Sequence, residues 1–71
     1  NNIKNNNNMK IIKTVTDTEN KPFVLVQAND SADAEIFAQD NAAQEDDYFD
    51  GMEAGTATET ENVGVYHVPF N

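Results

Sequence analysis

The chain alternates short apolar stretches with long polar ones, and its apolar positions follow two different periods. Residues 9–16, 22–28 and 63–70 are rich in valine, isoleucine and phenylalanine, which are typical of β-strands. Between the second and third of these stretches, alanine and phenylalanine recur at helical spacing from Asp30 onward. This pattern predicts three strands, with one helix before the last of them.

The strands differ in how their two faces are composed. In residues 9–16, the face that carries Ile11 and Val15 is the better candidate for the core. In residues 22–28 both faces are apolar, because Phe23 and Leu25 share one face and Val24 and Val26 share the other. One of these faces is expected to cover the helix. The other would meet a second copy of the chain or remain partly exposed. In the last strand two sets of three alternate: Val63, Val65 and His67 on one face, and Tyr66, Val68 and Phe70 on the other.

The helix has a predicted start and end. Asp30 is the expected N-cap, with Asp33 three positions later, and both acids suit the positive end of a helix. Glu45 interrupts the apolar stripe, which predicts an end between Ala43 and Asp47. Tyr48 and Phe49 would then fold back to close the core. The residues expected on the core side of the helix and its tail are Ala34, Phe37, Ala38, Ala42 and Phe49.

Two polar stretches separate these elements. Residues 17–21 are short enough for a hairpin loop, and Pro22 opens the next strand where proline is tolerated. Residues 50–62 are predicted to form a loop, although the alternation in Thr56–Thr60 also fits a short edge strand.

The predicted fold class is α+β, with the element order strand, strand, helix, strand. We expect a three-stranded antiparallel sheet with strand order 2-1-3 and one amphipathic helix on one face. A right-handed crossover would carry the last strand over to the first. Residues 1–8 are almost entirely asparagine and are expected to form a disordered arm ahead of a single small domain, residues 9–71.

Length and charge narrow the range of partners. The 71 residues have a net charge of −9, and all four lysines lie within the first 21 residues. Direct binding to nucleic acid or to an anionic membrane is therefore disfavoured, and a basic protein surface or a cation is favoured. Acidity that serves only to maintain solubility is the alternative. A core this small also gains from oligomerisation, so both a monomer and a homodimer remain open.

The residues that catalysis needs are scarce. The chain has no cysteine. Nothing in the spacing of the sequence pairs its single histidine, His67, with its single serine, Ser31. The sequence indicates no nucleophile paired with a general base, and we expect no enzymatic activity. Asp46 and Asp50 before Gly51 resemble part of a calcium loop, but Tyr48 and Ala57 stand where two ligands are required. We therefore expect no metal site and no cofactor.

The spacing of the acids is the most informative feature. Asp33, Asp40 and Asp47 are seven residues apart and would form one line along a continuous helix. Ile36 lies among the acids, either as an apolar anchor in a contact patch or as a lone exposed side chain. The residues expected to bind a partner are Asp33, Glu35, Ile36, Asp40, Asp46, Asp47 and Asp50.

In size, charge and expected topology, the chain resembles the small phage-borne nucleic-acid mimics that block restriction, repair or CRISPR proteins. This resemblance implies a non-enzymatic inhibitor that occupies the basic groove of a nucleic-acid-binding protein. Its location would be cytoplasmic, in the host cytoplasm if the protein is viral. The alternative is a structural or assembly accessory of a larger particle. No leader or membrane-spanning segment is expected, because no apolar run is long enough.

Overall fold

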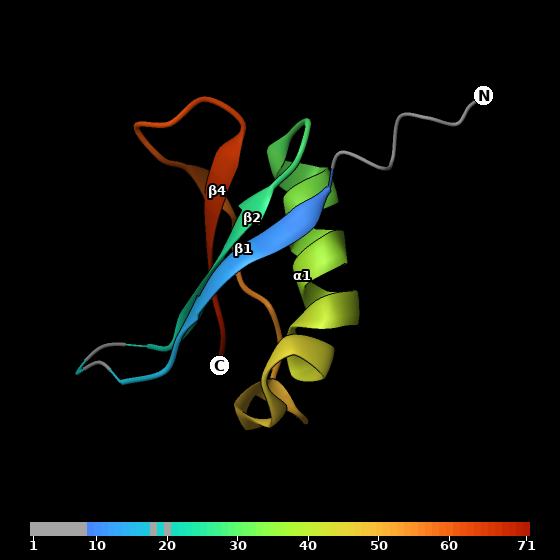
Figure 1. Cartoon of the computed structure of the whole chain (residues 1–71), viewed down its shortest axis with the longest axis vertical. Coiled ribbons are helices and arrows are strands. Elements are labelled where there is room, and N and C mark those ends of the chain that lie inside the picture. The colour runs from blue at the N-terminus through green and yellow to red at the C-terminus, as the bar shows by residue number, and fades with distance from the viewer. Residues whose placement is uncertain (1–8, 18, 20) are drawn as a thin grey trace.

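A computed structural model of the chain shows a four-stranded antiparallel sheet with one helix packed against one face (Figure 1). It describes residues 9–17, 19 and 21–71, and the predicted arm at residues 1–8 lies outside them. The elements in chain order are β1 (Lys10–Val15), β2 (Phe23–Gln27), α1 (Ser31–Glu45), the 3-10 helix η2 (Asp47–Phe49), β3 (Thr58–Glu59) and β4 (Val65–Pro69). The predicted α+β class is confirmed.

The strand order is β1-β2-β4-β3, so the predicted three-stranded sheet with order 2-1-3 is wrong. That prediction joined the helix to the last strand through a loop at residues 50–62 that did not reverse the chain a further time. In the structure, residues 52–57 (the return segment) run back along α1 and reverse the chain once more before β4 begins (Figure 1). β4 is therefore antiparallel to β2 and pairs with it directly, from Phe23 opposite Pro69 to Gln27 opposite Val65.

The edge beside β4 is made by a stretch that was predicted mainly as a loop. Thr58 and Glu59 form the two-residue strand β3, with Thr58 opposite His67, so the edge-strand alternative for residues 56–60 is realised in part. Further back, Ala54 forms an isolated bridge with Phe70. Glycine and threonine in this stretch gave it a loop-like composition, but pairing with β4 holds it in place.

A bulge in β1 changes which of its side chains face the helix. The register with β2 shifts between Ile11 and Lys13, and the extra residue moves the later positions to the other face. Ile11 consequently packs against the core, whereas Val15 pairs with Phe23 on the side away from the helix. The expectation that Ile11 and Val15 share the core face is wrong for this reason.

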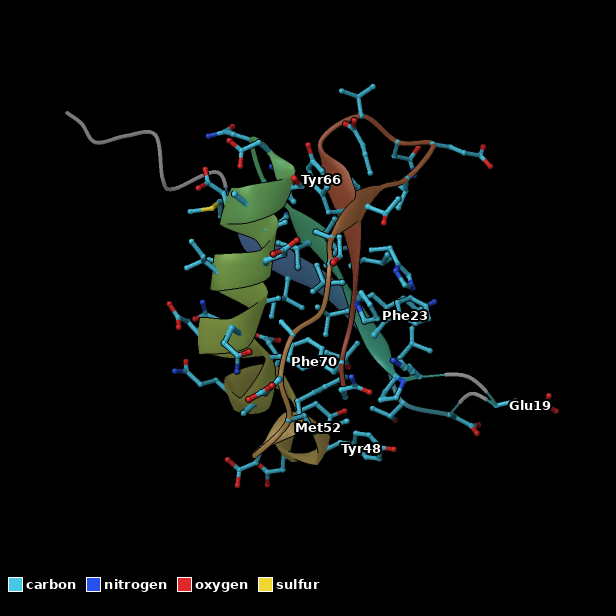
Figure 2. All side chains as sticks on the ribbon, turned by 180° about the vertical axis from the view of Figure 1, so that it is seen from behind. Glu19, Phe23, Tyr48, Met52, Tyr66 and Phe70 are labelled. Atoms are coloured by element: carbon cyan, nitrogen blue, oxygen red, sulfur yellow. The ribbon has the colours of Figure 1, made fainter. Side chains whose placement is uncertain are left out.

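The core lies between α1 and one face of the sheet. Val24 and Val26 from β2, and Tyr66 and Val68 from β4, are buried there with Phe70 just beyond β4. The helix contributes Ala34, Ala38 and Ala42, which are all buried. Small side chains at every fourth position let the helix axis lie close to the sheet. Figure 2 shows Tyr66 and Phe70 between the helix and the sheet, with Phe23 on the opposite side.

The other side of the sheet is not covered by any described element, and we call it the open face. Residues there alternate with the buried ones. They come from all four strands: Lys10, Lys13, Val15, Phe23, Leu25, Gln27, Thr58, Val65, His67 and Pro69. Val63 was predicted to join this set. It instead lies in the turn before β4 and is 92% exposed.

The predicted helix boundaries are confirmed. Asp30 is the N-cap, and its side chain accepts the Asp33 backbone N–H at 2.8 Å. At the other end, Asp46 is extended and donates its N–H to the Ala42 carbonyl at 2.9 Å. Phe49 folds back into the core as predicted, but Tyr48 remains 53% exposed. Gly51, with a φ of +84°, allows the sharp turn into the return segment that a side chain would oppose.

Candidate functional site

The acidic residues gather on the helix side of the molecule. Residues 30–53, which we call the helix layer, contain nine of the thirteen carboxylates and no lysine. They comprise α1 with its N-cap, η2 and the turn that follows. The described lysines, Lys10, Lys13 and Lys21, are all exposed and belong to β1 and the hairpin that follows it. The fold therefore separates the nine acids of the helix layer from the described lysines in space as well as in sequence.

The three acids predicted to form a line are not all on one helix. Asp33 and Asp40 lie on α1, two turns and about 10 Å apart along its axis. The extended backbone of Asp46 ends α1 before Asp47, which belongs to η2. The helical line therefore contains two of the three carboxylates. Asp47 and Asp50 lie beyond the end of α1, at the first residue of η2 and at its C-cap.

Two of the predicted binding residues form hydrogen bonds with the backbone of the protein. The Glu35 carboxylate accepts the backbone N–H of Ala57 at 2.8 Å and so ties the return segment to α1. The Asp46 carboxylate accepts the N–H of Tyr48 at 3.0 Å and starts η2. Each satisfies a backbone donor that would otherwise lack a partner within the protein. These two side chains contribute charge to the helix layer, but their orientation is set by the fold.

The remaining four acids of the predicted site have carboxylates that are not used by the fold. Among the described residues, the carboxylates of Asp33, Asp40, Asp47 and Asp50 accept no hydrogen bond. Asp40, Asp47 and Asp50 are exposed, and Asp33 is half-buried. A carboxylate with unused acceptor capacity can receive an ammonium or guanidinium group without breaking a bond within the fold. These four are the acids best placed to bind an external cation.

Ile36 lies beside this set in a shallow pocket. Its side chain is 63% exposed. The pocket has a volume of about 200 Å³ and is lined by Glu35, Ile36, Gln39, Asp40 and Ala54. It combines an apolar wall from Ile36 and Ala54 with carboxylates, and it opens to solvent. The structure thus brings together three of the predicted residues, Glu35, Ile36 and Asp40.

The sequence reasoning missed Gln39 and Ala54. The side-chain amide of Gln39 accepts the Ala54 N–H at 2.7 Å and donates to the Met52 carbonyl at 3.2 Å. It therefore pairs with the return segment much as a strand residue would. A polar residue at the margin of a helical apolar stripe could have suggested such a role, but its partners lie 13 and 15 residues further along the chain.

We expect Gln39→Ala to lower the free energy of unfolding by about 1–2 kcal/mol, because one substitution removes both hydrogen bonds. The measurement is urea unfolding followed by circular dichroism. Gln44→Ala is the matched control, since Gln44 is an exposed glutamine on the same helix and its loss should change stability by less than about 0.5 kcal/mol. Equal effects of the two substitutions would show that the hydrogen bonds from Gln39 to the return segment do not contribute to the free energy of unfolding.

The single histidine and the single serine lie on opposite sides of the sheet, and Tyr66 lies on the helix side. Burial raises the pKa of the Tyr66 phenol above its ordinary value, and the charges of Glu59 and Asp30 raise it further. His67 lies on the open face, where its ring is 4.4 Å from that of Phe23. Ser31 is in the first turn of α1, on the other side of the sheet. The described part of the chain contains no group of three His, Asp or Glu side chains that could hold a metal ion.

Within residues 9–17, 19 and 21–71, no helix has both the length and the apolar character needed to cross a membrane. No family model, curated protein or solved structure matches this chain.

Proposed function

We propose that this protein is a small, non-enzymatic acidic binding protein whose helix layer occupies the basic nucleic-acid-binding groove of a partner protein. The observation that carries the proposal is the helix layer itself, with nine carboxylates and no lysine on one side of the fold. Such a surface favours a basic protein partner and disfavours direct contact with nucleic acid or an anionic membrane. The compartment we propose is the cytoplasm, that of the host if the protein is viral.

The charge density of the helix layer supports mimicry of a phosphate backbone. Residues 30–45 carry five carboxylates over about 24 Å, which is roughly one charge per 5 Å. One DNA strand carries about one charge per 3.4 Å. The four acids of residues 46–53 follow within a short turn and raise the density at that end. The surface is thus nearest to a phosphate backbone around the end of α1.

The pocket beside Ile36 supports a partner with long basic side chains. An arginine or lysine could lay its apolar stem against Ile36 and Ala54. Its charged end would then reach Asp40, whose carboxylate accepts no hydrogen bond from the described residues. The same partner would find Asp33 one to two turns away on α1. Apolar contact at the centre with charge around it is the usual composition of a binding hot spot.

The test removes three carboxylates from the proposed site. The resulting variant is compared with a control variant of the same net charge. Asp33, Asp40 and Asp47 changed together to asparagine should weaken partner binding about 100-fold, at about 1 kcal/mol for each lost ion pair. The control variant combines Asp17→Asn, Glu19→Gln and Glu61→Gln, three exposed acids outside the helix layer. It also loses three charges and should bind within about threefold of the unmodified protein.

Binding is measured by competition. Basic proteins from the native host are enriched on heparin and loaded with a fluorescent DNA duplex or RNA strand. The protein should then release the labelled nucleic acid, as followed by anisotropy. Direct binding of the labelled protein to the same fraction, measured by anisotropy without nucleic acid, should weaken at least tenfold when the salt concentration rises from about 50 to about 200 mM. Equal losses for the two triple variants, or no competition at low salt in any fraction, would rule out the proposed function.

A structural or assembly accessory is the second candidate, and the open face favours it. Half-buried Phe23, Leu25 and Val65 lie there without any covering element in the described structure. Association through such side chains should be almost indifferent to salt, in contrast to groove binding. Removing residues 1–8 should weaken assembly that depends on that segment and should leave groove binding unchanged.

A further inference from the structure

We infer, resting on the proposed function, that the pocket between α1 and the return segment binds one arginine side chain of the partner in preference to a lysine. The pocket has a volume of about 200 Å³ and is lined by Glu35, Ile36, Gln39, Asp40 and Ala54. Sites for drug-sized ligands usually measure about 300–1,000 Å³. This pocket is smaller and suits a single long side chain.

The walls of the pocket are fixed before any partner arrives. The Gln39 side-chain amide accepts the Ala54 N–H at 2.7 Å and donates to the Met52 carbonyl at 3.2 Å. The Glu35 carboxylate accepts the Ala57 N–H at 2.8 Å. These bonds hold the return segment alongside α1 (Figure 2). A partner side chain therefore enters a preformed site, and its binding does not have to order the walls.

The charge of the pocket selects a cation. Glu35 and Asp40 are carboxylates, and the other three lining residues are neutral. The Glu35 carboxylate uses its Oε2 atom to accept the Ala57 N–H, and the Asp40 carboxylate accepts no hydrogen bond from the described residues. Both carboxylates thus keep acceptor capacity for an incoming donor. Residues 30–53 contain no lysine, so no cation of the helix layer competes for these acceptors.

The apolar wall favours arginine over lysine. Exposed Ile36 and half-buried Ala54 offer carbon surface beside the carboxylates. A guanidinium group is planar and weakly hydrated, so it loses little hydration when it lies flat on such a surface. An ammonium group is compact and strongly hydrated, and contact with the same surface costs it more. The stems of both side chains can pack on Ile36, so the difference lies in the charged groups.

The positions of the two carboxylates on α1 lead to the same preference. Glu35 and Asp40 are five residues apart, which places them about 140° apart around the helix axis, with Ile36 between them. The five donors of a guanidinium point outward in one plane, so an edge can reach a carboxylate while the flat face stays on Ile36. The three donors of an ammonium share one nitrogen, which has no flat face to lie on the isoleucine.

The test titrates the full chain with two capped tripeptides, Gly-Arg-Gly and Gly-Lys-Gly, at a salt concentration of about 20 mM, where screening is weak. Amide chemical shifts are followed by NMR. The arginine peptide should shift the Ala54 backbone amide and the Gln39 side-chain amide. It should also bind at least about threefold more tightly than the lysine peptide. Equal affinities, or arginine shifts confined to residues outside the pocket, would overturn the inference.

Ile36→Ala separates the pocket from general charge attraction, because it keeps all nine carboxylates of the helix layer. It should weaken arginine binding at least about threefold by removing apolar surface. Val63→Ala is the matched control, since Val63 is 92% exposed in the turn before β4, and it should bind arginine like the unmodified protein. Circular dichroism checks that both variants fold. Arginine binding that is unchanged in Ile36→Ala would contradict a site in the pocket.

Failure of this titration is distinguishable from failure of the groove competition. The tripeptides need no partner protein, so a preference for arginine that is lost in Ile36→Ala supports the pocket even where no nucleic acid is displaced. Displacement of nucleic acid without any preference for arginine would leave the proposed function intact. It would assign the contact to charge alone and overturn the inference about the pocket.

Discussion

Phe70→Ala should lower the free energy of unfolding by about 4 kcal/mol, enough to unfold much of a domain of this size at room temperature. Phe70 is 1% exposed and is the largest of the fully buried side chains. Its ring packs against that of Phe49 with a centroid separation of 4.8 Å. The surrounding valines and alanines are held by the sheet and by α1, so they cannot move in to fill the space. The cavity would therefore remain.

Urea unfolding of the Phe70→Ala variant, followed by circular dichroism, measures this loss. Tyr48→Ala is the matched control, because Tyr48 also contacts Phe49, at 5.7 Å between ring centroids, yet is 53% exposed. Its removal should lower stability by less than about 1 kcal/mol. If both aromatic deletions shift the unfolding midpoint equally, the core is not centred on Phe70.

The second large effect is expected from enlarging the central alanine in the contact between helix and sheet. Ala38→Leu should lower the free energy of unfolding by about 2–3 kcal/mol, as overpacking does in a well-filled core. Ala38 is fully buried at the centre of a row with Ala34 and Ala42. Three added carbon atoms would push α1 away from β2 and β4. The hydrogen bonds from Gln39 and Glu35 to the return segment would stretch with it.

The matched control is Ala32→Leu, an exposed position one turn and a half earlier on the same helix. Alanine and leucine have nearly equal helix propensities, so this change should alter stability by less than about 0.5 kcal/mol. Both variants are compared by thermal and urea unfolding. An unchanged midpoint for Ala38→Leu would mean that the helix does not rest on the sheet at that residue.

Local features of the fold were predictable, whereas its long-range connections were not. The Asp30 cap, the helix end before Asp47 and the burial of Phe49 all follow from side chains close together in the sequence. The strand order depends on the direction of the return segment. That direction is set by contacts from Glu35 to Ala57 and from Gln39 to Ala54, which no periodicity reveals. The bulge at Ile12 likewise leaves no mark in the alternation.

In the candidate site, too, the local features were predictable and the long-range contacts were not. The gathering of acids in the helix layer follows from their positions in the sequence, and so does the exposure of Ile36 among them. The pocket was not predictable, because one of its walls is Ala54 from the return segment. Glu35 and Asp46 were assigned to partner binding on charge alone. Whether a carboxylate is used by the backbone depends on the tertiary position of an N–H group.

The opposite placement of the helix layer and the β1 lysines makes each chain an electric dipole. In the field of a charged protein such a dipole feels a torque, and the molecule turns as it approaches. A basic surface would meet the helix layer first, so fewer collisions are wasted in the wrong orientation. The gain is in the rate of association and not in the lifetime of the complex. Because the field fades over about 8 Å at physiological salt, the turning happens in the last nanometre of approach.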